Sequence, residues 1–385
     1  MSSQPTQSTA THRLRFDLGE ASGALGDLGT FVPLVAALVA MCHLDLGSVL
    51  LFAGLCNVLS GVLFGQPIPV QPMKAIAAVG IAEAISPGAI AAAGLLAGGI
   101  VLLLGITGLV RTVERHIPSP VVRGIQLGVG LKLLIAGIGM IGPMDWTLDG
   151  PIVAMVAAAF VLITGRWARF PSALFLFVFG IAMMLFLQPE LLGRLELGWD
   201  GITPIVPDLD QWRDGFLRGT VPQLPLTLLN SVIAVCALSG DLFPGRSIRV
   251  RSMAVSVGLM NVVGCWFGAM PMCHGSGGLA GQHRFGARTG GSVVMLGLAK
   301  ILLAVTLGSS AVVLLDAYPM SILGILLCFA GVELALPARK ATGPDEFFLV
   351  VVTAGGCLGF NTAIGFSLGI LAALLIGARN RFGAP

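Results

Sequence analysis

Long apolar stretches separated by short polar segments run along this chain from residue 20 to residue 378. A helix needs roughly 20 apolar residues to cross a bilayer, and helices buried within a bundle can be shorter. We therefore predict an all-α polytopic membrane protein with fourteen transmembrane segments in two sets of seven. The predicted spans are 20–42, 46–65, 73–86, 89–110, 119–141, 151–164 and 171–187, followed by 222–239, 253–269, 275–287, 290–312, 318–335, 346–358 and 362–378.

Polar segments set the predicted domain boundaries. The N-terminal tail has no apolar stretch of signal-peptide type, so we expect no cleaved leader. We predict a cytoplasmic tail (1–19), a first seven-helix repeat (20–187), an extracytoplasmic connection (188–221), a second, inverted repeat (222–378) and a second cytoplasmic tail (379–385).

Composition supports the membrane class and argues against several others. Hydrophobic residues make up 56% of the chain and charged residues 11%, whereas about 25% of an ordinary soluble domain is charged. The seven cysteines have no CxxC spacing, which argues against a disulfide framework or a zinc site. The chain contains neither GxxxxGK[ST] nor HExxH. A GxSxG match at 365–369 lies inside a predicted span, which favours helix packing over a hydrolase nucleophile.

The distribution of basic residues predicts the orientation. If the N-terminus is cytoplasmic, fifteen of the 22 Lys and Arg residues fall in cytoplasmic segments. Arg194, Arg213 and Arg218 fall on the other side, all within the long connection. Cytoplasmic loops are enriched in Lys and Arg, so we predict a multi-pass protein of the cytoplasmic (inner) membrane with both termini in the cytoplasm.

An internal repeat relates the two halves. GLCNV at 54–58 recurs as GLMNV at 258–262, an offset of 204, and the same offset carries Pro67 to Pro271 and Val70 to His274. Seven predicted spans separate the copies, and this odd number means that the second copy enters the membrane from the opposite side. The sequence therefore predicts an inverted repeat, an arrangement typical of secondary transporters.

Two helix-hostile segments match under this offset. QPIPVQPMKA (residues 66–75, the first break) and PMCHGSGGLAGQHRFGAR (residues 271–288, the second break) both interrupt apolar sequence and lead into a new helix. Proline excludes helix from the first break, and Pro72 is suited to a first helical turn. Two helices that begin near the midplane from opposite sides direct their N-terminal dipoles at one place, which favours an anion site.

Each break carries candidate ligands and an alternative interpretation. Lys74 lies in the first turn after its break, where inserting an ammonium into the membrane costs roughly 2.5–3.5 kcal/mol. Lys74 pairs directly with an anionic ligand in the functional interpretation. In the structural alternative it snorkels to the membrane surface or pairs with a carboxylate. In the second break, Gly275 and Gly277 allow close backbone approach, Ser276 offers a hydroxyl and His274 a switchable donor. The alternative is that these glycines only allow tight helix packing.

Several long motifs resemble one known family. GALGDLGTFVP at 23–33, PIPVQPMKAIAA at 67–78, LPLTLLNSVIAVCALSGDLFP at 224–244 and PMCHGSGGLAGQHRFGARTG at 271–290 are similar to the molybdate transporter family first known from plants and algae, a branch of the sulfate permease (SulP) superfamily. The resemblance covers nearly the whole chain. It implies the seven-plus-seven fold of uracil permease-like transporters, in which a core domain moves against a gate domain, and it implies no STAS domain.

The resemblance also assigns candidate residues. Asp27 in the first span and Asn230 in the eighth would line one cleft with the two half-helices. Asp27 is either a proton-coupling group or part of a fixed ion pair with Lys74 or Lys300. Asn230 either contacts the ligand or bridges helices by hydrogen bonding. For Glu83, Lys132, Lys300 and Glu333 we expect mutual pairing within the bundle. The predicted substrate-binding set is Gln71, Lys74, Asn230, His274, Gly275, Ser276, Gly277 and Gln282.

The sequence thus predicts a non-enzymatic secondary transporter that imports molybdate by proton symport, through an elevator-like or rocking motion. No cofactor or metal is expected, since molybdate is bound as an oxyanion. Expected partners are molybdate, tungstate or sulfate, protons, membrane lipids and a second copy in a homodimer. A sulfate or other oxyanion carrier or exchanger, an anion channel, a sensor and, more remotely, an intramembrane enzyme remain alternatives.

Overall fold

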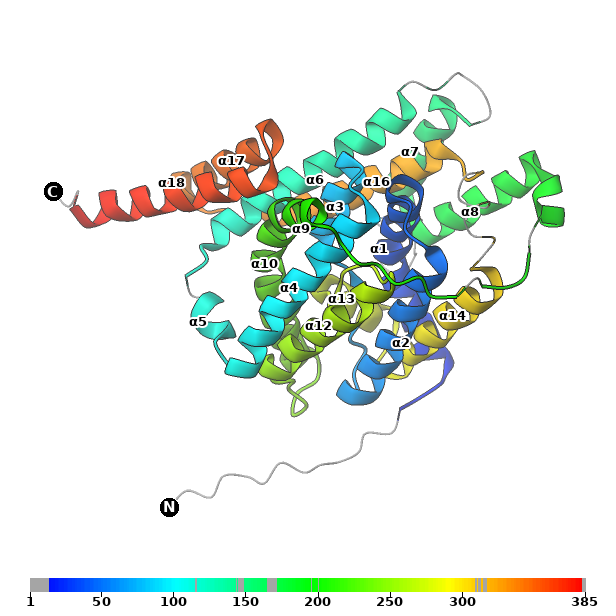
Figure 1. The fold of residues 1–385 in the computed structure, drawn as a ribbon, viewed down its shortest axis with the longest axis horizontal. Helices are drawn as coiled ribbons and strands as arrows, with labels where there is room; N and C mark the ends of the chain where they lie inside the picture. The colour runs from blue at the N-terminus through cyan, green and yellow to red at the C-terminus, as the bar shows by residue number, and fades with distance from the viewer. Residues whose placement is uncertain are drawn as a thin grey trace, which may run out of the picture.

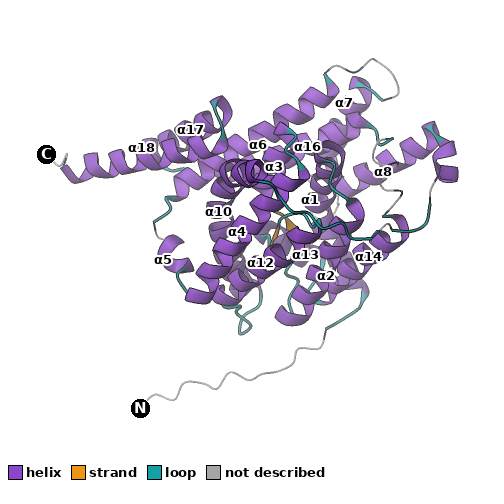
Figure 2. Ribbon diagram, viewed as in Figure 1, coloured by secondary structure: helices purple, strands orange, loops and turns teal. Residues whose placement is uncertain are grey.

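The computed structural model describes residues 14–114, 116–142, 144, 149–164, 172–194, 196–199, 201–308, 310, 313 and 317–382. Helices form almost all of this part of the chain, and they pack side by side into one bundle (Figure 1). Two short strands lie in the middle of the bundle, next to α13 (Figure 2). The N-terminal tail 1–13 and Arg115, Arg166 and Arg169, which contribute to the predicted charge bias, lie outside the described residues.

The first half of the chain forms helices whose bounds follow the predicted spans closely. Its elements are α1 (Leu18–Cys42), α2 (Leu46–Phe64), β1 (Gln71–Pro72), α3 (Lys74–Glu83), α4 (Pro87–Thr107), α5 (Val110–Glu114), α6 (Ser119–Ile141), α7 (Pro151–Thr164), α8 (Ser172–Leu187) and the 3₁₀ segment η1 (Pro189–Arg194).

The second half begins with one long helix that changes its hydrogen-bond pattern along its length. This helix comprises α9 (Leu209–Asp214), the π-helical η2 (Gly215–Thr220), α10 (Val221–Leu226), the π-helical η3 (Thr227–Ile233) and α11 (Ala234–Leu242). The following elements are α12 (Val250–Gly264), η4 (Cys265–Phe267), β2 (Met272–Cys273), α13 (Ser276–Phe285), α14 (Gly291–Leu307), α16 (Met320–Ala335), η5 (Leu336–Lys340), α17 (Gly343–Gly359) and α18 (Thr362–Phe382).

The long helix begins thirteen positions before the predicted span 222–239, so part of the predicted connection 188–221 is helical. The reason is a capping box at its start: the carboxylate of Asp208 accepts from the amide of Gln211, and the Gln211 side chain accepts from the amide of Asp208. This reciprocal cap satisfies two N-terminal donors, which allows a helix to begin in polar sequence.

Among the described residues, seven helices are long and apolar enough to cross a membrane, and α1 makes an eighth if its two parts are counted as one span. The two parts of α1 are inclined by 44°, and Pro33 lies within the helix. The proline ring conflicts with the carbonyl four residues earlier, which is a sufficient cause of the bend. The helices α3 and α13 have only ten residues each, so each can run only part of the way across a bilayer.

Helix contacts recur when the halves of the chain are exchanged. Helix α2 packs on α14 and α4 packs on α12; α1 packs on α13, and α3 packs on η2 and α10; α6 packs on α16. If α1, α2, α3, α4 and α6 are matched with the 209–242 helix, α12, α13, α14 and α16, the α2–α14 contact corresponds to α4–α12. The α1–α13 contact then corresponds to that of α3 with the long helix, and α6–α16 corresponds to itself. These contacts are consistent with a two-fold repeat.

The two breaks meet as an antiparallel pair of strands. β1 pairs with β2, with Gln71 opposite Cys273 and Pro72 opposite Met272, and the Met73 amide donates to the Pro271 carbonyl over 2.8 Å. Because the strands run in opposite directions, α3 and α13 leave this pair with opposite headings. The two half-helices thus begin at one place in the middle of the bundle (Figure 2).

Segments predicted to share a membrane side contact one another. In the long connection, the amides of Gly198 and Ile205 donate to the carbonyls of Thr306 and Trp266, at 3.0 and 2.8 Å. At the other end of the bundle, Arg111 and residues 247–251 line one cavity. Which side of a membrane either set of segments faces stays a prediction.

Candidate anion-binding site between the two breaks

A small enclosed cavity of about 20 Å³ lies where the two breaks meet the neighbouring helices. It is bordered by the first break, the η3 segment, β2 and the residue before α13, with α6 and α16 opposite. The residues that line it are Gln71, Lys74, Gln126, Gln223, Leu226, Asn230, Ser231, Cys273, Gly275 and Leu334. The lining therefore has amide, hydroxyl and ammonium groups but no carboxylate.

Lys74 is the cation of this site. It is the first residue of α3 and is half-buried against the cavity. Within the described part of the chain, its ammonium has neither an ion-pair partner nor a hydrogen-bond acceptor. Lys74 is near enough to attract the Asp27 carboxylate, but the two form no close ion pair. A cation held inside a helical bundle without a close ion pair favours an anionic ligand.

Gln71 and Asp27 form a buried pair beside the cavity. Nε2 of Gln71 donates to Oδ1 of Asp27 over 2.5 Å, and both side chains are almost completely buried. The remaining oxygens, Oδ2 of Asp27 and Oε1 of Gln71, have no partner among the described residues. Buried polar atoms are normally hydrogen-bonded, so Oδ2 of Asp27 is free to take up a proton and Oε1 of Gln71 is free to accept a hydrogen bond.

Lys300, on α14, provides a second buried charge near Asp27. Its ammonium is close enough to attract the Asp27 carboxylate and lies 3.3 Å from the ring centre of Phe31. A cation over an aromatic face is stabilised by the ring quadrupole. The Nζ atom has no hydrogen-bond partner among the described residues, so Asp27 and Lys300 interact through charge and not through a close ion pair.

Asn230 and Ser276 connect the long helix to α13. The Ser276 hydroxyl donates to Oδ1 of Asn230 over 2.7 Å, and Asn230 lies in the π-helical segment η3. π-Helical turns are frequent at functional sites. Asn230 thus borders the cavity and also bridges two elements, and its contact with a ligand stays a prediction.

Glycines allow the second break to approach the Gln71–Asp27 pair. A Cβ on Gly278 would lie 2.5 Å from Nε2 of Gln71 and 2.7 Å from Oδ1 of Asp27, and one on Gly275 would meet Oε1 of Gln71. Cβ atoms are not found at such distances, so a larger residue at either position would force the Gln71 side chain or α13 to shift. Gly277, in contrast, is exposed, and nothing lies near its Cβ position.

The two half-helices differ at their N-termini. Oε1 of Gln223 accepts from the amides of Ala75 and Ile76, at 2.8 and 3.3 Å, so a side chain already caps α3. For the amides of Ser276 and Gly277, the described residues supply no acceptor. The first amides of a helix are the donors that bind anions, and here α13 has them available whereas α3 contributes Lys74.

His274 and Gln282 do not border the cavity. The His274 ring is held between Oγ of Ser256 and the Pro69 carbonyl, each at 2.9 Å. Gln282 accepts from the Ser292 hydroxyl over 2.7 Å. In this conformation His274 connects the second break to α12 and to the first break, and Gln282 connects α13 to α14.

Sequence reasoning missed Gln223, Asn57 and Asn261. Oδ1 of Asn57 accepts from the Val70 amide, and Oδ1 of Asn261 accepts from the Met272 amide. The signal was present, because both asparagines belong to the repeated GLCNV and GLMNV motifs, which we used only to find the offset. Gln223 carried no comparable signal.

Expected pairing inside the bundle is confirmed for Glu83 and Lys132. Nζ of Lys132 lies 2.5 Å from Oε1 of Glu83, and Nε of Arg218 lies 3.7 Å from Oε2. Ser367, in the GxSxG match, donates to the Ala363 carbonyl within α18, which is an ordinary helical contact.

Solved structures of low sequence identity share this fold. The chain superposes on SLC26A9 with a TM-score of 0.69 at 15% identity, covering 94% of this chain and 65% of that chain. The transmembrane domain of the cyanobacterial bicarbonate transporter BicA gives a TM-score of 0.66 at 14% identity, covering 92% of this chain and 97% of that chain.

Curated relatives are far more similar in sequence. Molybdate transporter 1 of Arabidopsis thaliana is 43% identical over 95% of this chain and 90% of its own length. Molybdate transporter 2 of the same plant is 40% identical (94% and 87%), and molybdate transporter 1 of Chlamydomonas reinhardtii is 34% identical (93% and 91%). Residues 19–133 and 215–334 match the family described as molybdate transporter of MFS superfamily. The chain belongs to the molybdate transporter family and has the fold of SLC26 and SulP transporters.

Proposed function

We propose that this protein is a secondary transporter that imports molybdate by proton symport and binds it between the two breaks. The observation that carries the proposal is Lys74, which borders the cavity and forms no ion pair or hydrogen bond with the described residues. The assignment of molybdate as the substrate rests on the family to which the chain belongs. The geometry supports an anion site, because a lysine and several side-chain amides line the cavity where the two half-helices begin.

The ligand contacts follow from the groups that the site offers. Lys74 provides the fixed positive charge, and the side-chain amides of Gln71 and Asn230 provide N–H donors. The Ser276 hydroxyl donates to Asn230 and so orients that amide. The open amides of Ser276 and Gly277 add donors at the positive end of the α13 dipole, and Gly275 lets the backbone come close. In this role His274 and Gln282 position the second break and do not contact the ligand.

Charge balance supports proton coupling. Molybdate carries two negative charges, which Lys74 and Lys300 offset, but an ionised Asp27 leaves the loaded site with one excess negative charge. One proton on Asp27 makes the loaded site neutral. Moving a neutral assembly through a membrane is far less costly than moving a charged one, so proton and substrate would cross together.

The cavity supports an occluded state that must widen. A volume of about 20 Å³ is close to the 10–15 Å³ that one water requires, and a tetrahedral oxyanion is several times larger. The lining includes Gln126 of α6 and Leu334 of α16, opposite the breaks. We infer that a core group carrying the breaks moves against a gate group containing α6 and α16, within a fourteen-span inverted repeat whose termini are cytoplasmic.

The test is a binding titration of the purified protein with molybdate, tungstate, sulfate and uracil. We expect tight molybdate binding, and about 10- to 100-fold weaker binding for Lys74→Ala, because one charge-assisted contact is lost. Lys340→Ala, an exposed lysine at the end of η5, is the matched control. Wild-type affinity in Lys74→Ala would refute a direct role for Lys74. Sulfate binding as tight as molybdate binding would overturn the substrate assignment.

A further inference from the structure

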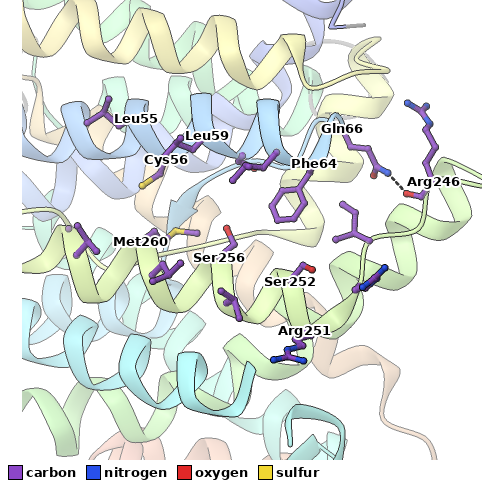
Figure 3. A pocket seen from close by; sticks show the side chains of 18 of the residues that line it. Leu55, Cys56, Leu59, Phe64, Gln66, Arg246, Arg251, Ser252, Ser256 and Met260 are labelled. Atoms are coloured by element: carbon purple, nitrogen blue, oxygen red, sulfur yellow. Dashed lines mark hydrogen bonds between the residues drawn. The ribbon is translucent and has the colours of Figure 1, made fainter. Parts of the chain in front are cut away.

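A second, much larger cavity lies on the other side of the breaks. It has a volume of about 1190 Å³ and runs between α2 and α12 (Figure 3). We call it the α2–α12 groove. Its walls are residues 52–66 and 245–264, so neither α6 nor α16 contributes to it. The groove is therefore separate from the proposed molybdate site.

The two ends of the groove differ in chemistry. Along its length the walls are apolar, with Leu59, Leu63 and Val263 more than half exposed in the bundle. Arg246, Arg249 and Arg251 line the groove, and Figure 3 shows Arg246 and Arg251 toward the end where Gln66 and Ser252 also lie. The described lining contains no Asp or Glu, so the charged end is purely cationic.

The three arginines lack ion-pair partners among the residues that the structure describes. The Arg246 guanidinium lies 4.9 Å from the ring centre of Phe243, and Arg249 and Arg251 are exposed. Arginine binds phosphate through parallel N–H donors. Three such side chains at the end of an apolar groove match an anionic head group attached to a hydrocarbon chain.

The length of the groove fits one leaflet. On α2 the lining extends over the thirteen residues from Phe52 to Phe64, and the twelve steps of 1.5 Å between them span about 18 Å. Half of a hydrocarbon core of roughly 30 Å is about 15 Å. The arginine end belongs to the side predicted to be cytoplasmic, where anionic lipids attract basic residues.

We propose that the α2–α12 groove binds an anionic phospholipid of the inner leaflet, with its phosphate at the three arginines and an acyl chain along α2 and α12. A free oxyanion would use the arginines but leave the apolar walls uncovered. The lipid would lie against Ser60 and Ser256, which hydrogen-bond to the Ile68 carbonyl of the first break and to His274 of the second.

The test uses the full chain in phosphatidylcholine vesicles that contain a small fraction of phosphatidylglycerol with a photoactivatable acyl chain. After illumination, labelled peptides are mapped by mass spectrometry. We expect labelling of residues 52–64 and 252–263, at least severalfold above labelling by the matching phosphatidylcholine probe. Each of Arg246→Ala, Arg249→Ala and Arg251→Ala should lower this preference about fivefold.

Matched variants separate the lipid from other occupants. Leu59→Trp should fill the apolar wall and abolish labelling, whereas Leu103→Trp on the exposed face of α4 and Arg339→Ala should label like wild type. Equal labelling by both probes would overturn the proposal. So would displacement of the lipid probe by excess inorganic phosphate, which would indicate a free anion site. Loss of a dimer in Leu59→Trp would also overturn it, since a second copy would then cover the groove.

Discussion

Asn57 and Asn261 lie 204 positions apart, and each accepts a hydrogen bond from a backbone amide of the extended segment that follows its own helix. Oδ1 lies 2.8 Å from the Val70 amide in the first case and 2.7 Å from the Met272 amide in the second. Extended backbone inside a membrane protein lacks helical partners for its amides. The two asparagines supply acceptors and so hold both strands at the site.

Replacing either asparagine by alanine should destabilise the protein, and Asn261→Ala should cost more. Asn261 also donates to the Val257 and Met272 carbonyls, whereas Nδ2 of Asn57 has no partner among the described residues. Each orphaned buried backbone group costs about 1–3 kcal/mol. Thermal unfolding in detergent measures the stability, and molybdate uptake measures the effect on the site.

Asn380→Ala is the control for this pair, because Asn380 is exposed near the end of α18. It should unfold and transport like wild type. If Asn57→Ala and Asn261→Ala were indistinguishable from it, the asparagines would not position the breaks.

The breaks were predictable because proline and glycine restrict the backbone locally. Pro67, Pro69 and Pro72 exclude helix, and α3 begins at Lys74, one residue after the predicted start of that span. The direction of a buried side chain depends on distant neighbours instead. His274 was assigned to the ligand because it lies in the second break, but Ser256 and Pro69, one of them in the other half of the chain, hold its ring.

Helix capping shows the same limit of prediction from sequence: local contacts can be predicted and distant ones cannot. The start of the 209–242 helix depends on local chemistry, since Asp208 and Gln211 are three residues apart. The segment is polar, so the apolar pattern alone did not predict a helix there. The cap of α3 comes from Gln223, about 150 residues away along the chain, and no local sequence pattern predicts this contact. Interactions between the halves of the bundle are therefore what the sequence leaves open.

Asp27→Asn should separate binding from coupling. Asparagine retains an oxygen that can accept from Gln71, but it cannot gain or lose a proton. We expect molybdate affinity within a few-fold of wild type and loss of uphill accumulation driven by a pH gradient in proteoliposomes. Calorimetry measures the first quantity and isotope or dye uptake the second.

The control for charge removal is Asp210→Asn, in the exposed first turn of the 209–242 helix. It should accumulate molybdate normally. Uphill accumulation by Asp27→Asn at the wild-type level would show that Asp27 is not the proton-coupling group. That result would not bear on the proposal that molybdate binds at this site.

Gly278→Ala should disrupt the site more than an ordinary helical glycine substitution. The new Cβ would lie 2.5 Å from Nε2 of Gln71, so the Gln71–Asp27 pair or α13 must shift. We expect loss of most molybdate binding with the protein still present in the membrane. Gly99→Ala, in α4, meets nothing within 4 Å and should bind normally. Normal binding by Gly278→Ala would mean that the pair can move without consequence.

The Glu83–Lys132 ion pair should limit the rate of transport. It connects α3, which follows the first break, to α6, on the opposite side of the cavity, over 2.5 Å. If these two groups slide past each other, the pair must break in each cycle. Lys132→Met should therefore raise the maximal uptake rate while leaving molybdate affinity nearly unchanged.

A double-mutant cycle of Lys132→Met and Glu83→Gln measures the strength of this pair. The side chains are 12% and 24% exposed, so we expect a coupling energy of about 1 kcal/mol or more, at or above the top of the range for exposed pairs. The Arg123–Glu346 pair is the matched control, because it joins α6 to α17 and does not bridge the cavity. Arg123→Met should leave the rate unchanged, and a rate effect as large as that of Lys132→Met would show that the α3–α6 contact has no special place in the cycle.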